Sequence, residues 1–240
     1  ADNSGQTVTQ GSNPAVSDEA PVITQRGSSA ETSNTITINA SENATANVTI
    51  SNVNIDTSSA AIATSGKGNV NIELDGTNTL KSGVDHAGLE KNSDGNQGKL
   101  TITDENENGK LIATGGDYGA GIGGSDRGNG SNITITGGEI TAIGGYRGAG
   151  IGGGDYAGGN DITITGGKVT ATGGEYGAGI GGGNQGNGSS ITIPGGEVTA
   201  AGGTNGAGIG GGLGKEGEKI TVSGDATLKV QGGPADSWDG

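Results

Sequence analysis

Hydrophobic and polar residues alternate along most of the chain, in short runs that end at paired glycines. In "ITITGG", which begins at Ile162, the isoleucines fall on one face of an extended strand and the threonines on the other. The next run, "KVTATGG", places Val169 and Ala171 on the apolar face, and "GAGIGG" then places Ala178 and Ile180 there. The pattern predicts three short strands joined by glycine pairs, because glycine-rich, β-branched sequence disfavours helix.

These three runs recur along the chain as one repeating unit. The unit begins at positions 29 residues apart: Ile133, Ile162, Ile191 and Ile220. Earlier units of 33, 30 and 22 residues begin at Leu100, Val70 and Val48. Internal repeats of this length are typical of solenoids and arrays.

The predicted fold is all-β: a right-handed parallel β-helix (a solenoid) of about seven coils, with three short strands per coil. Stacked coils are closed by hydrogen bonds from one coil to the next. Equivalent residues then form columns, one of them Ile133, Ile162, Ile191 and Ile220, and another Ile122, Ile151, Ile180 and Ile209. Seven coils at ~4.8 Å each give a rod of roughly 34 Å.

The two ends of the chain depart from the repeat. Residues 1–34 are polar and lack the period, so we predict a leader or tether there, followed by a single β-helix domain over 35–240. Within it, 35–47 form a partial coil that caps the N-terminal end. Residues 220–240 form the C-terminal coil and tail, where Trp238 either covers the core or leads into another domain.

Composition changes this picture little once the period is recognised. With 56 glycines and a net charge of −14, an aperiodic chain would be predicted to be disordered. A narrow β-helix core needs few apolar residues, and glycine supplies positive φ at the corners. The 12 Lys and Arg against 26 Asp and Glu argue against nucleic acid as a partner. No apolar run approaches the ~18 residues of a membrane span, so we expect no membrane insertion.

Catalytic and metal-binding residues are scarce. A lyase-like site needs a basic residue beside acidic metal ligands, yet Arg127 and Arg147 are the only arginines in the coils. His86 is the sole histidine, and we interpret it as a solvated corner residue. A Gly-Asp calcium repeat is matched only once, by "AGGNDITI", rather than in successive turns. We therefore expect no enzymatic activity, no metal and no cofactor.

The corner before each "GAG" carries the candidate binding residues, with one more on the loop that follows. They are Asp117, Tyr118, Tyr146, Arg147, Tyr156, Glu175 and Tyr176. Tyrosine beside carboxylates suits a sugar, because the ring stacks and the carboxylates accept hydroxyl hydrogen bonds. We expect Tyr118 and Tyr176 ~10 Å apart, with Tyr146 between them. The alternative is that these residues only make the loops soluble.

Outward threonines form a second candidate feature. The predicted file is Thr49, Thr101, Thr134, Thr163, Thr192 and Thr221, with Asn71 substituting once. A parallel file of Thr103, Thr136, Thr165 and Ser223 is broken by Pro194. A flat T-x-T array is similar to that of β-helical antifreeze proteins and leaves ice binding as an alternative. Threonine also suits any exposed strand.

Several stretches carry a family resemblance. "ANVTISNVNI", "VNIELDGTNTLKSG", "LTITDENENGKLIATGG" and the "GAGIGGG" units resemble repetitive β-helix regions of secreted and surface proteins from gut and anaerobic Gram-positive bacteria. The region 35–232 is similar to the β-helical carbohydrate-binding domain family first described in a cellulolytic clostridium. The resemblance implies an extracellular protein that binds plant polysaccharides with calcium. This chain, however, has glycine where the acidic "GDGID"-type corners of that family would stand.

Together these observations predict a non-catalytic extracellular module, secreted or at the cell surface, that binds glycans or acts as an adhesin within a larger surface protein. Asp117 and Glu175 would repel an acidic sugar, which favours a neutral polysaccharide or a neutral host or plant glycan. Two alternatives stay open: a structural stalk that presents another domain, and an ice-binding face.

Overall fold

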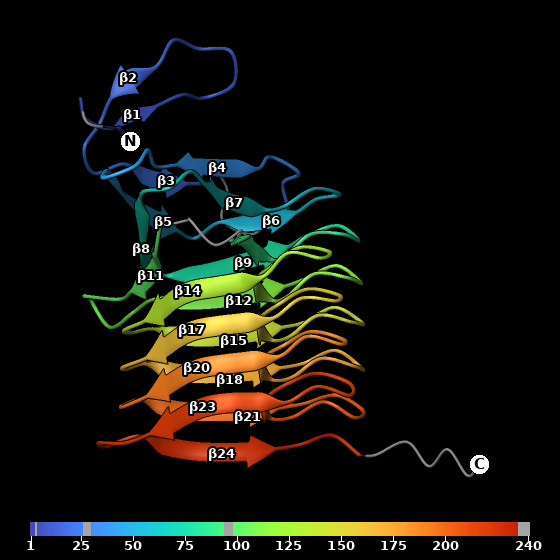
Figure 1. The fold of residues 1–240 in the computed structure, drawn as a ribbon. Helices are drawn as coiled ribbons and strands as arrows, with labels where there is room; N and C mark the ends of the chain where they lie inside the picture. The colour runs from blue at the N-terminus through green and yellow to red at the C-terminus, as the bar shows by residue number, and fades with distance from the viewer. Residues whose placement is uncertain (3, 26–29, 94–97, 235–240) are drawn as a thin grey trace.

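The protein is a right-handed parallel β-helix of about seven turns (Figure 1). The computed structural model describes residues 1–2, 4–25, 30–93 and 98–234. Within this part of the chain there are strands and turns but no helix, and hence no helix that could span a membrane. The predicted all-β fold with three strands per coil is confirmed.

Three parallel sheets run the length of the β-helix, and we name each by its repeat sequence. The ITI sheet contains β3 (Val22–Thr24), β5 (Thr45–Ser51), β8 (Asn69–Asp75), β11 (Leu100–Thr103), β14 (Gly130–Ile135), β17 (Gly159–Ile164), β20 (Gly188–Ile193) and β23 (Gly217–Val222). The VTA sheet contains β6 (Asn54–Asp56), β9 (Thr77–Lys81), β12 (Lys110–Thr114), β15 (Glu139–Ile143), β18 (Lys168–Thr172), β21 (Glu197–Ala201) and β24 (Thr227–Gln231). The GIG sheet contains β4 (Ile36–Asn39), β7 (Ile62–Ser65), β10 (Leu89–Glu90), β13 (Ile122–Gly123), β16 (Ile151–Gly152), β19 (Ile180–Gly181) and β22 (Ile209–Gly210).

The core is a stack of like residues, as the period predicts. In the ITI sheet Ile133 pairs with Ile162, which pairs with Ile191. In the GIG sheet Ile122 and Ile151 pair in the same way. All five side chains are fully buried, so the apolar face of every strand points into one continuous narrow core.

The register of the first coils differs from the prediction. We expected Val48 to begin a unit aligned with Val70, but Val70 pairs with Ala46 instead. Thr49 consequently pairs with Glu73 and does not stand in the file of Asn71. A shift of two residues leaves every side chain on the same face, so the hydrophobic pattern cannot distinguish the two registers.

The β-helix also begins earlier than predicted. β3 pairs in parallel with β5, and Thr32 bridges to Ile55, so the first coil takes in part of the segment that we expected to be a leader. Ahead of it, β1 (Thr7–Val8) and β2 (Val16–Ser17) form an antiparallel hairpin at the N-terminal end (Figure 1). The side chain of Gln6 donates to the carbonyl of Asn47 (2.8 Å) and accepts from its amide (2.9 Å), which joins this segment to β5.

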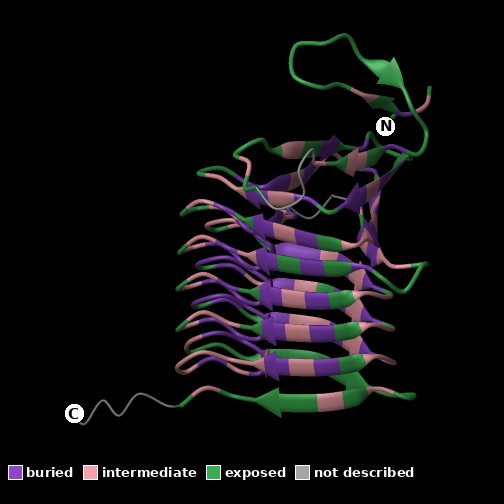
Figure 2. Cartoon of the chain, turned by 180° about the vertical axis from the view of Figure 1, so that it is seen from behind, coloured by how far each residue is buried: buried purple, intermediate pink, exposed green. Residues whose placement is uncertain are grey.

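The last coil, in contrast, is exposed along most of its length, with Ala226 and Leu228 half-buried against the core (Figure 2). Its inward-facing positions Ile220, Val222 and Val230 are 39%, 49% and 48% exposed. Their partners one coil earlier are fully buried, so this coil is the last to which the described part of the core extends. Trp238, which we considered as a cover for this end, lies outside the described residues.

Candidate functional site

From β10 onward, two loops in each coil flank the two-residue strand of the GIG sheet, and these loops share one edge of the β-helix (Figure 1). The first loop carries most of the predicted site residues, and the second carries Tyr156. Backbone hydrogen bonds join the first loop of one coil to the second loop of the next. The amide of Asp155 donates to the carbonyl of Tyr118 (2.8 Å), and that of Asn184 donates to the carbonyl of Arg147 (2.7 Å).

The loop register places Arg147, not Tyr146, between Tyr118 and Tyr176. The amide of Arg147 donates to the carbonyl of Asp117 (2.8 Å), and that of Tyr176 donates to the carbonyl of Tyr146 (3.3 Å). In a parallel ladder an amide bonds the carbonyl that precedes its register partner, so Tyr118, Arg147 and Tyr176 form one column. Tyr146 lies on the intervening coil, one position before this column, because the pair "YR" is offset by one position from "DY" and "EY".

Two aromatic contacts follow from this register. The guanidinium carbon of Arg147 lies 5.6 Å from the centre of the Tyr118 ring, a cation–π arrangement. The rings of Tyr146 and Tyr176 meet edge to face, with centres 5.3 Å apart and planes at 79°. The hydroxyl of Tyr146 also donates to that of Tyr176 at 3.4 Å. The structure therefore joins four of the predicted residues into two contacting pairs.

A buried carboxylate that the sequence analysis missed anchors Arg147. Asp155 is only 3% exposed, and it accepts hydrogen bonds from Arg147 Nη1 (3.1 Å) and from Asn184 Nδ2 (2.7 Å). The hydrogen bond and charge of Asp155 raise the pKa of Arg147 above its usual value, so the arginine stays charged. The positive charge of Arg147 is neutralised by the carboxylate of Asp155, and this ion pair holds the arginine side chain against the loop edge.

The predicted site residues differ in exposure, and Asp117 and Glu175 are exposed. Tyr146 and Tyr156 are 44% and 52% exposed, whereas Tyr118 and Tyr176 are half-buried. Hydrogen bonds with Tyr146 and then Glu175 raise the pKa of the Tyr176 hydroxyl, which therefore remains neutral. We call the following set the tyrosine ridge: Asp117, Tyr118, Tyr146, Arg147, Tyr156, Glu175 and Tyr176.

Four stretches of the chain match the family model described as beta helix repeat: residues 107–126, 133–155, 162–184 and 191–213. This chain is a repetitive β-helix protein. The matched stretches include every residue of the tyrosine ridge except Tyr156. Comparison with curated proteins and with solved structures finds no match. The β-helix fold occurs in enzymes and in non-enzymes, so the family match bears on architecture alone.

The threonine file of the β-helix is regular only over its later coils. Thr134 pairs with Thr163, which pairs with Thr192, as predicted. At the N-terminal side the adjacent file reaches Glu73, whose carboxylate accepts a hydrogen bond from Thr103. The same adjacent file is interrupted again by Pro194, toward the C-terminal end. The array therefore departs at both ends from the repeating T-x-T pattern that an ice-binding face would use.

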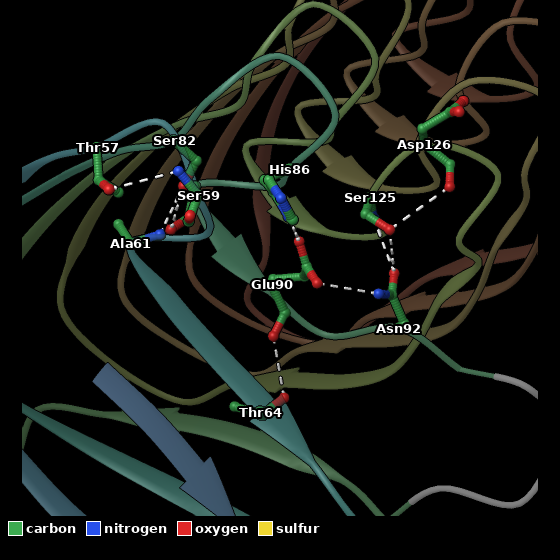
Figure 3. Close-up of polar contacts among 11 residues, drawn as sticks. Thr57, Ser59, Ala61, Thr64, Ser82, His86, Glu90, Asn92, Ser125 and Asp126 are labelled. Carbon is green, nitrogen blue, oxygen red and sulfur yellow. Dashed lines mark hydrogen bonds and ion pairs between the residues drawn. The ribbon is translucent and has the colours of Figure 1, made fainter. Parts of the chain in front are cut away.

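The sole histidine of the β-helix belongs to a polar network on the loop edge (Figure 3). His86 Nδ1 lies 2.8 Å from Glu90 Oε2, and Asn92 Nδ2 donates to the other oxygen of Glu90 (3.1 Å). The hydroxyl of Ser125 donates to Asn92 Oδ1 (3.1 Å) rather than to the imidazole. This arrangement links successive coils and provides no activated nucleophile. Among the described residues, no three His, Cys, Asp or Glu side chains are grouped so that they could hold a metal ion.

Replacing Asp155 by alanine is expected to destabilise the β-helix by roughly 1–3 kcal/mol, because the Arg147 guanidinium and the Asn184 amide lose a buried acceptor. Asp126 is the matched control. It stands at the equivalent position one coil earlier, where its carboxylate lies 3.9 Å from the exposed Arg127. Alanine there should cost at most about 0.5 kcal/mol. Urea unfolding compares the two variants, and equal losses would show that the Asp155 network contributes little.

Proposed function

We propose that this β-helix is a non-catalytic module that binds a neutral glycan through the tyrosine ridge. It acts outside the cell, secreted or on the surface, as an adhesin or carbohydrate-binding part of a larger surface protein. The observation that carries the proposal is the pair of exposed rings, Tyr146 and Tyr156, held on a loop edge that backbone hydrogen bonds tie together coil by coil.

The chemistry of the ridge suits a sugar. An aromatic ring offers an apolar face against which the C–H side of a sugar stacks, and its hydroxyl hydrogen-bonds at the rim. The carboxylates of Asp117 and Glu175 are exposed beside the rings and can accept hydrogen bonds from sugar hydroxyls. Because successive coils repeat at ~4.8 Å, the ridge presents these groups at regular intervals along an extended ligand. A rigid scaffold of this kind lowers the entropy cost of binding.

Charge favours a neutral ligand. Arg147 is already paired with the buried Asp155, so its charge is not available for an acidic sugar. The exposed carboxylates of the ridge and the net charge of −14 would repel a polyanion. The resemblance of the repeats to the β-helical carbohydrate-binding domain family of Gram-positive bacteria supports a plant or host polysaccharide.

The absence of catalysis is part of the proposal. The groups with catalytic potential on the loop edge are bound to partners within the fold: Arg147 to Asp155 and His86 to Glu90. Glycoside hydrolysis is carried out by a pair of carboxyl groups, one acting as acid and the other as base or nucleophile, and neither of these basic groups supplies one. Incubation with the bound polysaccharide should therefore leave its chain length unchanged.

Screening on a glycan array, followed by calorimetry with the best neutral polysaccharide, tests the proposal. Alanine in place of Tyr146, and separately in place of Tyr156, should weaken binding by about 5- to 150-fold, on the scale of ~1–3 kcal/mol per stacked ring. Both side chains are exposed, so the fold should tolerate their loss. Thr163→Ala on the ITI sheet is the control and should bind as the parent protein does.

The outcomes separate the alternatives. Binding that neither tyrosine substitution weakens would place the site elsewhere on the β-helix. A preference for acidic polysaccharides would overturn the argument from charge. If no glycan binds at all, the stalk interpretation becomes the better one.

A further inference from the structure

The outer face of the VTA sheet carries a column of alternating charge in the middle of the β-helix. Along each strand of this sheet, buried residues alternate with residues that face outward (Figure 2). The first residues of β12, β15, β18 and β21 pair in unbroken register, and they are Lys110, Glu139, Lys168 and Glu197. Lysine therefore alternates with glutamate from coil to coil. We call these four residues the charge ladder.

Within one chain the charge ladder joins neighbouring coils. Lys110 Nζ lies 2.7 Å from Glu139 Oε2, and the two side chains are 52% and 51% exposed. Lys168 and Glu197 are exposed as well. Exposed ion pairs of this kind contribute little to the stability of a single chain. The outer side of the ladder is accessible, so its charges can also meet those of another molecule.

Beside the charge ladder, the same face is uncharged. Two of its residues, Ile112 and Ile143, are each 37% exposed. Threonine occupies both of their columns in other coils, so the strands do not require isoleucine there. Exposed aliphatic side chains on a sheet face favour contact with another surface, because that contact removes them from water. The outward residues beside the ladder, in strand order, are Ile112, Thr114, Thr141, Ile143, Thr170, Thr172, Thr199 and Ala201.

The charge ladder is complementary to itself when a second copy is turned over. A two-fold axis along the strands, midway between β15 and β18, places two VTA sheets face to face with the rods antiparallel. Lys110 of one copy then faces Glu197 of the other. Glu139 likewise faces Lys168 of the other copy, and the uncharged columns cover one another. Packed sheets stand ~10 Å apart, a distance that lysine and glutamate side chains together can span.

Charge and area both bear on a second copy as the partner. The whole chain has a net charge of −14, which opposes the approach of two copies through most of their surface. The charge ladder has two lysines and two glutamates, so this face is locally neutral. Six strands from β9 to β24, at ~4.8 Å each and ~3.3 Å per residue, give a face of roughly 480 Å² per copy. Two such faces total about 1,000 Å², the lower limit for a specific interface, which indicates a weak dimer.

We propose that two copies of this chain form a weak dimer face to face through the VTA sheet, with the rods antiparallel and the charge ladders in contact. The interface uses the same surface of both copies and therefore closes at two. It is formed by strands inside the β-helix, so it does not depend on what precedes or follows the described residues. This inference is independent of the glycan proposal.

Sedimentation equilibrium, from micromolar to millimolar chain concentration, tests the association. We expect a reversible equilibrium between monomer and dimer. Glu139→Lys should weaken the dimer by about 10-fold or more, because a lysine would then face Lys168 of the other copy at two symmetry-related contacts. Lys168→Glu should weaken it in the same way. The double substitution should restore the dimer, because each lysine again faces a glutamate.

The double substitution also separates contacts between copies from contacts within one chain. Within one chain it leaves like charges adjacent at both ends of the charge ladder, so the melting temperature of the monomer should not recover with the dimer. Glu42→Lys is the matched control. It makes the same change in net charge in the exposed turn between β4 and β5, away from the VTA sheet, and should leave the dimer intact.

Three results would overturn the proposal. The first is a monomer at every concentration. The second is a dimer that Glu139→Lys weakens no more than Glu42→Lys does, because the charge ladder would then lie outside the interface. The third is a dimer that the double substitution fails to restore, because the antiparallel register would then be wrong. Circular dichroism checks that each variant keeps its β-structure, and Lys168→Glu provides a second single variant if Glu139→Lys does not fold.

Discussion

Replacing Gly174 by alanine is expected to lower the melting temperature by about 10 °C, for a cost of about 3 kcal/mol at the upper end of overpacking effects. A Cβ at this position would lie 1.6 Å from the carbonyl oxygen of Gly145 and 2.6 Å from its carbonyl carbon. Both are backbone atoms of the neighbouring coil and cannot rotate away. The two coils would therefore have to separate, which breaks contacts along the whole loop edge.

Thermal unfolding followed by circular dichroism measures this effect. Gly232→Ala is the control, because the nearest atom to its added Cβ would be the carbonyl oxygen of Gly206 at 3.7 Å, an ordinary contact. We expect the control to melt close to the parent protein. Similar losses in both variants would mean that glycine acts through chain entropy and not through the spacing of the coils.

The same close approach recurs at the corresponding glycine of the adjacent coils. An added Cβ would lie 1.7 Å from a carbonyl oxygen at both Gly145 and Gly203. The glycines that suggest a flexible linker are therefore required by the coil spacing. They also serve the candidate site, because Tyr146 directly follows Gly145 and Tyr176 lies two residues after Gly174. The contact between the two rings depends on how closely the coils stack.

The repeating part of the fold follows from the sequence because identical units stack in register. Once Ile133, Ile162 and Ile191 are recognised as equivalent, the period of two assigns every neighbouring side chain to the core or to the surface. The first coils lack that constraint. Ala46 and Val48 are both apolar and face the same way, so their sequence supports either register, and the structure selects the one that aligns Ala46 with Val70.

The candidate site could be predicted only in part, because its contacts lie between loops, where the strand pattern gives no register. The tyrosines are conspicuous in the repeat, but their partners depend on a one-residue offset between "YR" and its neighbours. Asp155 is buried because the second loop folds over the first loop of the preceding coil and its amide bonds the carbonyl of Tyr118. Strand alternation carries no information about such loop-to-loop contacts. The sequence does offer one signal of this contact. Three glycines precede both Asp155 and Asn184, and they let the backbones of the two loops pack closely.

Replacing Ile162 by alanine is expected to reduce the free energy of unfolding by about 2–5 kcal/mol, as for other large core residues. Ile162 lies in the middle of the ITI column, with Ile133 on one side and Ile191 on the other, and all three are fully buried. The cavity cannot collapse easily, because hydrogen bonds hold the neighbouring coils at a fixed spacing. Thr163→Ala is the control on the same strand; its side chain faces outward, and its loss should cost about 0.5 kcal/mol or less.

Urea unfolding distinguishes a local from a global effect of this cavity. Each coil of a solenoid contacts only its neighbours, so a weak coil either lowers the stability of the whole or divides it into two units. The core of this β-helix is continuous on both sides of Ile162, and we therefore expect one transition with a lower midpoint and an unchanged slope. A smaller slope, or two separate transitions, would contradict this expectation and show that the coils on the two sides unfold independently.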